Sequence, residues 1–252
     1  MQTGSIRVGA LTLAMVVTPS VALASAPCEE GFKTESSTVH DAIELHEQQC
    51  KSPKYRAFVL EVDLRSDEID FVVTPYDQRR LPTSEFAERF GAIAATNGGF
   101  WCKNWGGYTV SSGEMWPKYG DNDRVSVVGF GGWDLVKGRR YVDLRSADEV
   151  LTDVPGWMEH AVSGVPVILA AGEVQKDDYE LFQGRHPRTA IGITEDRNTL
   201  FLVVVDGRTK GWSWGLSSSQ LGELLLSLGA HDAVNLDGGQ SSRWWCPLRA
   251  GS

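Results

Sequence analysis

Short runs of apolar residues, separated by turn-forming residues, recur along the chain and predict strands. The runs are rich in β-branched and aromatic side chains and are bounded by Gly, Pro, Asn or Asp, as is typical of strands. The expected strands are Ala57–Val62, Ile69–Val73, Ala92–Thr96, Val125–Val128, Arg140–Leu144, Val162–Leu169, Thr189–Thr194, Leu200–Val205 and Ala233–Leu236. Because short connections join antiparallel neighbours, we expect a largely antiparallel sheet.

Three connections between these runs sharpen the prediction. Gly131-Gly132 is expected to form the turn that leads into the next strand. The two runs on either side of Asp196–Asn198 are expected to form a β-hairpin. Pro166 interrupts Val162–Leu169, so this run is expected to be an edge or bulged strand, because proline cannot donate to a ladder.

The clearest helix is predicted towards the C-terminal end of the chain. Leucines recur at i, i+3, i+4 and i+7 within Ser218–Leu228, which places them on one helical face. Ser217 and Gln220 have the spacing of a capping box, so the helix is expected to begin there. Gly229 directly follows and suits the end of a helix.

Helices are fewer than strands in this pattern, which predicts an α+β fold. Two shorter helices are expected, at Asp41–Gln49 and at Glu85–Phe90, the second with Ser84 as its N-cap. We expect a single domain with a mixed, largely antiparallel β-sheet core and a few packed helices. No Pro-rich or Gly/Ser-rich linker divides it, so a polar segment at 27–53 is followed by one domain at 54–252.

Residues 1–26 have the pattern of a secretory signal peptide. Arg7 gives a positive start, the apolar run Val8–Val17 follows, and Ala24-Ser25-Ala26 supplies an A-x-A pattern with cleavage expected after it. The alternative, a buried first helix, is disfavoured by this cleavage pattern. The run is shorter than the about 20 residues that a membrane span needs, and no later run qualifies. The mature chain is therefore expected to be secreted or periplasmic and to have no membrane span.

All four cysteines lie beyond the expected cleavage point, which in an exported chain predicts disulfides. Three connectivities are open. We favour Cys28–Cys50, which would tie down the N-terminal segment, and Cys102–Cys246, which would join two glycine-rich motifs described below. A zinc site is the competing interpretation, but the chain has no C-x-x-C or C-x-x-H spacing.

Composition and charge exclude several function classes. Of the 252 residues, 42% are hydrophobic and 23% charged, which excludes a disordered tail, a collagen-like fibre and a coiled coil. The net charge of -9, from 33 acidic and 24 basic residues, argues against nucleic acid as a partner. Nine tryptophans suit either stacking on sugar rings or sealing a core.

Two predicted strands end in the same arrangement of polar residues. Asn97-Gly98-Gly99 and Asp237-Gly238-Gly239 each place a carboxamide or carboxylate directly before two glycines. Glycine pairs let the backbone approach a ligand closely and leave peptide N–H groups free, which can form a nest for phosphate oxygens. The alternative is a pair of tight hairpin turns, since Asn-Gly and Asp-Gly favour such turns.

Cationic and acidic side chains lie near two other strand ends. Arg188 directly precedes a buried strand and could direct its guanidinium fork at phosphate. His186 could act as an acid or base, although a histidine beside proline in a loop is more often a solvated surface residue. Asp206, with Gly207 and Arg208, follows the other strand; its carboxylate is either reactive or only completes a turn.

The order of these motifs resembles that of the phosphodiester glycosidase family, over about Ala92 to Trp244. The motifs are Asn97-Gly98-Gly99-Phe100, Ser163-Gly164, Arg188-Thr189-Ala190-Ile191-Gly192, Val205-Asp206-Gly207, the Leu-rich helix, and Asn235-Leu236-Asp237-Gly238-Gly239 with Ser241. Single motifs are weak, but their shared order is a strong signal. The resemblance implies an exported hydrolase that breaks the bond between a sugar's anomeric carbon and a phosphate oxygen, releasing free sugar and a phosphomonoester.

The resemblance also implies roles for individual residues. Such a bond breaks through an oxocarbenium-like transition state, which needs a carboxylate near the sugar and stabilisation of the departing phosphate. Asp237 would be the nucleophile or base, with Asp206 as its partner. Arg188 and the glycine amides would hold the phosphate, and Asn97 would bond to sugar or phosphate. The substrate-binding candidates are Gly98, Gly99, Thr189, Arg208, Gly238, Gly239, Ser241, His186, Trp101 and Trp245.

One position departs from the family pattern, because Gln240 stands where the family usually has a third glycine. The substrate is therefore less defined than the reaction class, and neither the sugar nor the aglycone is fixed. Six tryptophans flank the motifs and either wall a sugar pocket or seal the core. They are Trp101, Trp105, Trp212, Trp214, Trp244 and Trp245.

Two other functions stay open on these residues. One is a non-catalytic carbohydrate-binding protein, although such a module does not need the set of Arg188, Asp206 and Asp237. The other is a phosphodiesterase that cleaves P–O with a metal held by the two aspartates. The hydrolase requires no cofactor, while a divalent cation such as calcium stays open because hard cations take carboxylate and carbonyl oxygens. The expected partner is a glycan or sugar-phosphate substrate.

Overall fold

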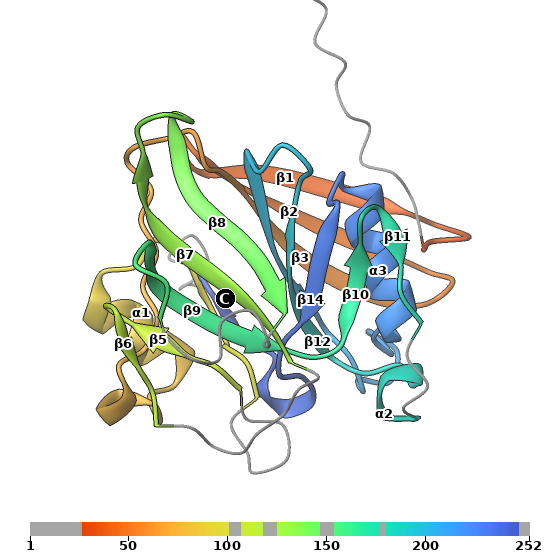
Figure 1. Cartoon of the computed structure of the whole chain (residues 1–252). Helices are drawn as coiled ribbons and strands as arrows, with labels where there is room; N and C mark the ends of the chain where they lie inside the picture. Colours follow the sequence, from red (N-terminus) through yellow and green to blue (C-terminus); the bar gives the residue numbers. More distant parts are fainter. Residues whose placement is uncertain (1–26, 101–106, 118–124, 147–153, 177–179, 247–252) are drawn as a thin grey trace, which may run out of the picture.

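An eight-stranded sheet is the largest element of the fold (Figure 1). The computed structural model describes residues 27–100, 107–117, 125–146, 154–176 and 180–246. The strands of this sheet are, in spatial order, β1 (Lys33–His40), β2 (Ile43–Cys50), β3 (Tyr55–Asp63), β13 (Thr199–Val205), β12 (Arg188–Ile193), β14 (Asp232–Asn235), β10 (Val167–Ala170) and β11 (Glu173–Val174). Every neighbouring pair in it is antiparallel.

A second sheet packs against one face of the first (Figure 1). Its strands, again antiparallel, are β6 (Glu114–Met115), β5 (Val110–Ser111), β9 (Met158–Gly164), β7 (Ser126–Asp134) and β8 (Arg139–Ser146). A two-stranded ladder pairs β4 (Ala95–Thr96) with β15 (Trp244–Trp245). The core between the two large sheets joins Phe58 and Leu60 of β3 to Val128 and Phe130 of β7.

Helix α3 (Ser218–Ser227) covers the opposite face of the eight-stranded sheet (Figure 1). The predicted capping box of Ser217 and Gln220 is present, which confirms the start of this helix. Its buried leucines pack on β-strand side chains such as Val203 and Val205. The other helices are α1 (Thr83–Phe90) and α2 (Glu180–Gln183), with short 3-10 turns η1 (Tyr76–Gln78) and η3 (Gly239–Ser241).

Alternate residues of each central strand serve different faces of the large sheet. In β13, Phe201, Val203 and Val205 face α3, whereas Leu200 packs towards the second sheet. Side chains alternate across a strand with a period of two residues, so a residue's parity decides which face it reaches. Polar residues that are neighbours in one strand can therefore serve different purposes on the two faces of the sheet.

The predicted α+β class with a largely antiparallel core is confirmed, and the domain is single. The one sheet expected from the sequence is in fact two large sheets. The predicted hairpin around Asp196–Asn198 is confirmed as β12 and β13, with Arg188 opposite Val205. No helix in the described part of the chain is long and apolar enough to span a membrane. Residues 1–26, the expected signal peptide, lie outside the described residues.

The prediction of a helix at Asp41–Gln49 is wrong, because this segment forms β2. Leu45 is buried towards the second sheet, and the polar His46 and Gln48 are buried on the opposite face of the strand. The polar side chains on that face hide the period of two that would have indicated a strand. Together with β1, this strand extends the edge of the large sheet beyond β3.

Three further expectations about strands and turns are corrected. Ile69–Val73 is irregular: Ile69 is buried and Phe71 packs on Phe130, with ring centroids 4.7 Å apart, so its apolar residues fill space without a ladder. Val162–Leu169 is not one strand, because the chain leaves β9 and enters β10 of the other sheet at Pro166. The residues Gly131-Gly132 lie inside β7 at a bulge, and the turn follows later. Helix α1 has Pro82, not Ser84, at its N-cap.

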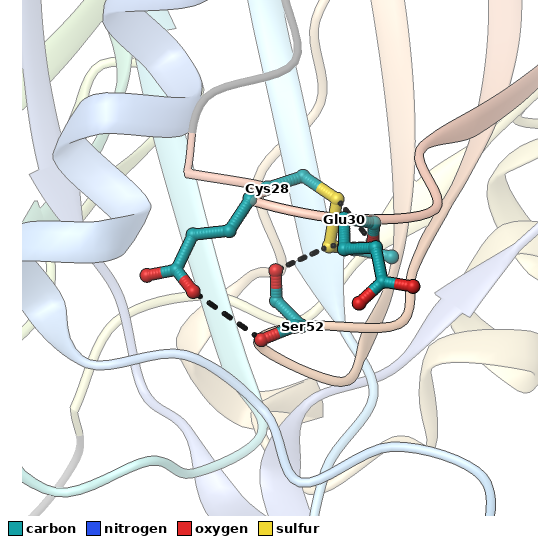
Figure 2. Close-up of a disulfide and its surroundings, with 5 residues drawn as sticks. Cys28, Glu30 and Ser52 are labelled. Atoms are coloured by element: carbon teal, nitrogen blue, oxygen red, sulfur yellow. Dashed lines mark hydrogen bonds between the residues drawn. A yellow bond between two sulfur atoms is a disulfide. The ribbon is translucent and has the colours of Figure 1, made fainter.

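The predicted disulfide between Cys28 and Cys50 is present, with Cα atoms 5.7 Å apart. Figure 2 shows the bridge beside Glu30 and Ser52, whose backbones pair across the two chain segments. Cys246 is a free and buried thiol. Its expected partner in the second bridge, Cys102, lies outside the described residues.

Candidate active site

Three of the singled-out segments meet at one edge of the large sheet. Asp237 follows the end of β14, and Asp206 follows the end of β13. Strand β12 lies between these two and begins at Arg188. Since β12 is antiparallel to both neighbours, its start and their ends lie at the same edge of the sheet.

Asn97 connects two of these segments through its side chain. Its Nδ2 donates to the Asp237 carbonyl oxygen over 2.9 Å, and its Oδ1 accepts from Thr189 Oγ1 over 2.7 Å. The same Oδ1 also accepts from the backbone N–H of Arg243 over 3.0 Å. The Asp237 N–H donates to the Gly98 carbonyl at 3.3 Å, so the two glycine motifs lie side by side. The predicted Asn97, Thr189 and Asp237 are thus brought together.

The backbone after Asp237 turns sharply around its two glycines. The Gly238 N–H donates to Asp237 Oδ1 over 2.8 Å, and the Gly239 N–H donates to the Pro187 carbonyl over 3.0 Å. Gly239 has φ of 66°, and a Cβ there would lie 3.2 Å from Arg208 Nη1. The glycine therefore lets the Arg208 guanidinium lie directly against this turn. The Ser241 N–H donates to the Gly238 carbonyl, which closes the 3-10 turn.

The side chains of Arg208 and His186 lie next to each other beside the turn. Arg208 is exposed and adopts a left-handed backbone with φ of 57°. Its Nε donates to His186 Nδ1 over 3.4 Å. Burial lowers the pKa of His186, and the charges of Arg208 and Arg188 lower this pKa further. The imidazole is therefore neutral at pH 7, while Arg208 supplies the positive charge.

Arg188 lies on the other face of β12. Its side chain is buried, and its Nε and Nη2 donate to the backbone carbonyls of Leu216, Leu181, Phe182 and Gly184. Burial lowers the pKa of its guanidinium to about 10, with a smaller contribution from Arg208. These four carbonyls belong to α2, the turn after it and the segment before α3. Arg188 therefore holds together the segments behind the site.

Ser163 and Gly164 pack between the two glycine motifs, although the residue candidates did not include them. A Cβ on Gly99 would overlap the Ser163 carbonyl, and a Cβ on Gly164 would overlap the Asn235 carbonyl. Backbones approach this closely only where side chains are absent. The sequence did contain a signal for these two residues, because Ser163-Gly164 is one of the motifs shared with the family. Arg243, which reaches Asn97 through its backbone, carried no such signal.

Asp206 is not joined to this cluster through its carboxylate. Its Oδ2 accepts from the indole Nε1 of Trp212 over 3.0 Å. Trp245 pairs with Ala95 in the two-stranded ladder, directly after the segment that reaches Asn97. The predicted Trp101, together with Trp105, lies outside the described residues. Within the described part, no three His, Cys, Asp or Glu side chains are grouped so that they could hold a metal ion.

Comparison with family models matches the phosphodiester glycosidase model to residues 90–251. The chain belongs to the phosphodiester glycosidase family. The match includes both glycine motifs, the β12–β13 hairpin and α3. A comparison with curated proteins found no match.

Solved structures share the fold of this phosphodiester glycosidase family member at low identity. The catalytic domain of zebrafish N-acetylglucosamine-1-phosphodiester alpha-N-acetylglucosaminidase, auto-inhibited by its pro-peptide, is 21% identical with a TM-score of 0.61, over 86% of this chain and 78% of that one. A hypothetical protein from Synechocystis is 13% identical with a TM-score of 0.55, over 86% and 60%. A putative exported protein from Burkholderia pseudomallei K96243 is 15% identical with a TM-score of 0.57, over 76% and 69%.

Proposed function

We propose that the protein is an exported hydrolase that cleaves a sugar-1-phosphodiester at the glycosidic C–O bond, releasing free sugar and a phosphomonoester. The observation that carries the proposal is the junction of Asn97, Thr189 and Asp237 beside Arg208 in a member of this family. A carboxylate and an exposed cation lie at one edge of the sheet, and the reaction needs both of these groups.

The departing phosphate is stabilised by charge in this proposal, because the N–H groups of Gly238 and Gly239, expected to bind it, already donate to Asp237 Oδ1 and to the Pro187 carbonyl. A phosphomonoester has a second pKa near 6, so it leaves well without strong protonation by an acid. Developing negative charge is best met by fixed donors and cations. The exposed guanidinium of Arg208 lies against Gly239 and serves as that cation. Neutral His186, which Arg208 contacts, is available for a hydrogen bond to the phosphate.

Asp237 acts at the sugar end of the scissile bond. As a base, its carboxylate takes a proton from water while the water oxygen bonds to the anomeric carbon. The C–O bond breaks, and its electron pair leaves on the phosphate oxygen. As a nucleophile, the carboxylate itself bonds to the anomeric carbon first, and water then hydrolyses that ester. Asn97 fixes the backbone carbonyl of Asp237 and so orients this residue.

Two residues change role from the sequence expectation. Arg188 is a positioning residue in this proposal, because its donors are directed to backbone carbonyls behind the site. The Asp206 carboxylate accepts from the indole of Trp212, and no hydrogen bond in the described part of the chain joins it to the cluster of Asn97, Thr189 and Asp237. The proposed mechanism therefore uses the single carboxylate of Asp237.

The experiment is hydrolysis of a panel of sugar-1-phosphate methyl diesters in oxygen-18 water. Cleavage of the C–O bond places the label on the sugar, and this is the expected result. Label on the phosphate would instead support the P–O-cleaving phosphodiesterase, and sensitivity to a chelator would support its metal-dependent form. No turnover together with tight glycan binding would support the non-catalytic carbohydrate-binding protein.

We also propose that the protein is secreted or periplasmic after cleavage near Ala26. The Cys28–Cys50 bridge supports this location, because disulfides persist in oxidising compartments. The fold shared with a putative exported protein supports it as well. The N-terminal sequence of the protein recovered outside the cytoplasm is expected to begin at Pro27. Recovery of the full chain from the cytoplasm alone would contradict the proposal.

A further inference from the structure

We propose that the loop between β13 and α3 carries a carbohydrate subsite centred on Trp212, which binds a sugar ring of the substrate beyond the bond that is cleaved. The proposal rests on the proposed function, because it assigns this subsite to the same substrate. The substrate class is then a sugar-1-phosphate linked to further sugar. Asp206 serves as a positioning residue for the indole.

Trp212 is held in one orientation although it is half exposed. The Cζ atom of Arg56 lies 3.8 Å from the centroid of the indole ring and covers one face. The indole Nε1 donates to Asp206 Oδ2 over 3.0 Å, which fixes the rotation of the ring in its plane. The residue still has 48% of its surface exposed. A large aromatic surface is thus kept in water at a fixed angle, which favours a ligand-binding role over a core role.

The groups that hold Trp212 are themselves fixed. Ser213 is fully buried; its Oγ donates to the Asp206 carbonyl over 2.6 Å and accepts from the Arg56 N–H over 3.2 Å. The backbones of Thr209 and Ser213 pair with each other and close the loop. Arg56 Nη2 lies 3.9 Å from Glu47 Oε2, with both side chains largely buried. Little conformational entropy is therefore lost when a ligand stacks on the indole.

Trp212 lies on the same face of the large sheet as the candidate active site. Arg56 shares the parity of Phe58 on β3, and Phe58 faces the second sheet. Trp244 stacks on Phe58, with ring centroids 4.9 Å apart. The residue before Trp244 is Arg243, whose backbone donates to Asn97. The face of β3 that holds Trp212 through Arg56 is therefore also the face on which the segment leading to Asn97 packs.

The spacing between Trp212 and Asp237 suits an extended substrate. Arg56 is on β3 and Asp237 follows β14, and β13 and β12 lie between these two strands. Three strand spacings are about 14 Å across the sheet, and this is the scale of a phosphate and a sugar ring together. Arg208, the proposed phosphate ligand, is in the same loop as Trp212. The sugar on the Trp212 side is therefore the one attached through the phosphate.

The chemistry around the indole favours sugar over a nucleobase. Aromatic platforms for nucleic acids are combined with a positively charged groove. This protein carries a net charge of -9, and the indole N–H of Trp212 is hydrogen-bonded to the carboxylate of Asp206. A pyranose presents C–H groups to an aromatic face and hydroxyl groups to neighbouring carboxylates, which Asp206 and the indole supply together. The occupant proposed for this surface is therefore a neutral sugar ring.

The test compares two substrates with the same sugar-1-phosphate, one with a methyl aglycone and one with an oligosaccharide aglycone. Trp212→Ala is expected to lower kcat/KM about five- to tenfold on the extended substrate, mainly through KM, from the loss of aromatic stacking. The methyl diester is expected to change less than twofold. Trp212→Phe keeps an aromatic face but loses the bond to Asp206, so it is expected to restore only part of the loss. Trp214→Ala is the matched control, because Trp214 is equally exposed in the same loop, and it is expected to leave both substrates unchanged.

Two variants of Asp206 separate positioning from catalysis. Asp206→Asn keeps an oxygen that accepts from the indole N–H, so it is expected to behave like the wild type on both substrates. Asp206→Ala removes the acceptor but keeps the aromatic face, so it is expected to show part of the defect of Trp212→Ala, on the extended substrate only. Loss of turnover of the methyl diester in Asp206→Asn would overturn the positioning role, because it would indicate a catalytic carboxylate.

The remaining outcomes distinguish this inference from the proposed function. An equal loss on both substrates in Trp212→Ala, or no loss on either, overturns the subsite and leaves the hydrolase intact. If the wild type cleaves neither diester, the proposed hydrolase fails. The subsite is then decided by titrating the uncleaved oligosaccharide diester against Trp fluorescence. Weaker binding by Trp212→Ala than by Trp214→Ala supports it, and equal binding by the two overturns it.

Discussion

The two faces of β12 differ in what their polar residues do. Arg188 and Thr189 are neighbours in the chain and point to opposite faces of the same strand. Arg188 donates to four backbone carbonyls on the side of α3, and Thr189 donates to Asn97 on the side of the second sheet. One residue holds the segments behind the strand, and the other belongs to the proposed site.

This difference shows how one strand can separate the residues that hold neighbouring segments in place from the residues of the proposed site. The period of two residues in a strand assigns each residue to one face without any further device. On the α3 face, the bonds of a buried cation order α2 and the segment that precedes α3. On the opposite face, hydrogen bonds between side chains and backbone leave a carboxylate and an exposed cation at the sheet edge. Each of the following predictions tests this separation.

The largest effect is expected for Arg188→Met, which fills similar space but removes the donors to four backbone carbonyls, two of them in buried hydrogen bonds. Hydrogen bonds to charged groups contribute about 1.5 to 3 kcal/mol each and are not additive, so we expect a loss of roughly 3 kcal/mol in the free energy of unfolding. Urea denaturation measures it. Arg208→Met is the matched control: its stability is expected to be close to that of the wild type, while diester hydrolysis is lost. Equal stability of the two variants would remove the distinction between the faces.

Asp237→Asn is expected to lower kcat well over tenfold and to leave the free energy of unfolding nearly unchanged. The asparagine oxygen still accepts from the Gly238 N–H, so the turn is kept, but the group can no longer act as nucleophile or base. Steady-state rates on a cleaved diester, together with urea denaturation, make the measurement. Near-normal turnover in this variant would remove Asp237 from the mechanism.

A smaller loss is expected for Thr189→Val, which removes one hydrogen bond on the site face. The Asn97 oxygen keeps its bond from the Arg243 N–H, so the cost is about 1 kcal/mol in unfolding free energy. We also expect a several-fold lower kcat, because Asn97 orients Asp237. Thr38→Val, at an exposed position of β1, is the control. Unchanged kcat in Thr189→Val would show that the Asn97 contacts serve only the fold.

The smallest effect is expected in the pH dependence of stability. Burial lowers the pKa of both His160 and His186, so the unfolded chain binds more protons than the folded one below about pH 6.5. The contribution of these two residues to the free energy of unfolding is fully present above that pH. It is lost as the pH falls towards their pKa values in the folded protein. His160→Gln and His186→Gln should each flatten the decline in urea-denaturation midpoint between pH 7 and pH 5. A steeper decline in either variant would contradict the direction of its shift.

Local pattern predicted much of the fold. The leucine period and capping box gave α3, and alternation with turn residues gave the β12–β13 hairpin, because these signals lie within a few residues of each other. The parity of Arg188 and Thr189 was readable in the same way, although the sequence interpretation assigned both to the ligand. Failures such as β2 occurred where polar side chains occupy a buried face.

The candidate site was only partly predictable, because its geometry depends on contacts between distant segments. The sequence named Asn97, Thr189 and Asp237, and the structure brings them together. The bond between Trp212 and Asp206, and the stacking of Arg56 on that indole, join β3 to a loop far along the chain. No spacing rule links such positions.

The Cys28–Cys50 bridge also bears on how the protein avoids self-association. Strand β1 forms one border of the eight-stranded sheet, and its first residues are exposed. The β1–β2 hairpin is closed by its turn at one end and by the disulfide at the other. The bridge therefore opposes the peeling of β1 from β2, which would present the hydrogen-bonding groups of β2 to a second molecule. We expect a reduced chain to self-associate more readily than an oxidised one.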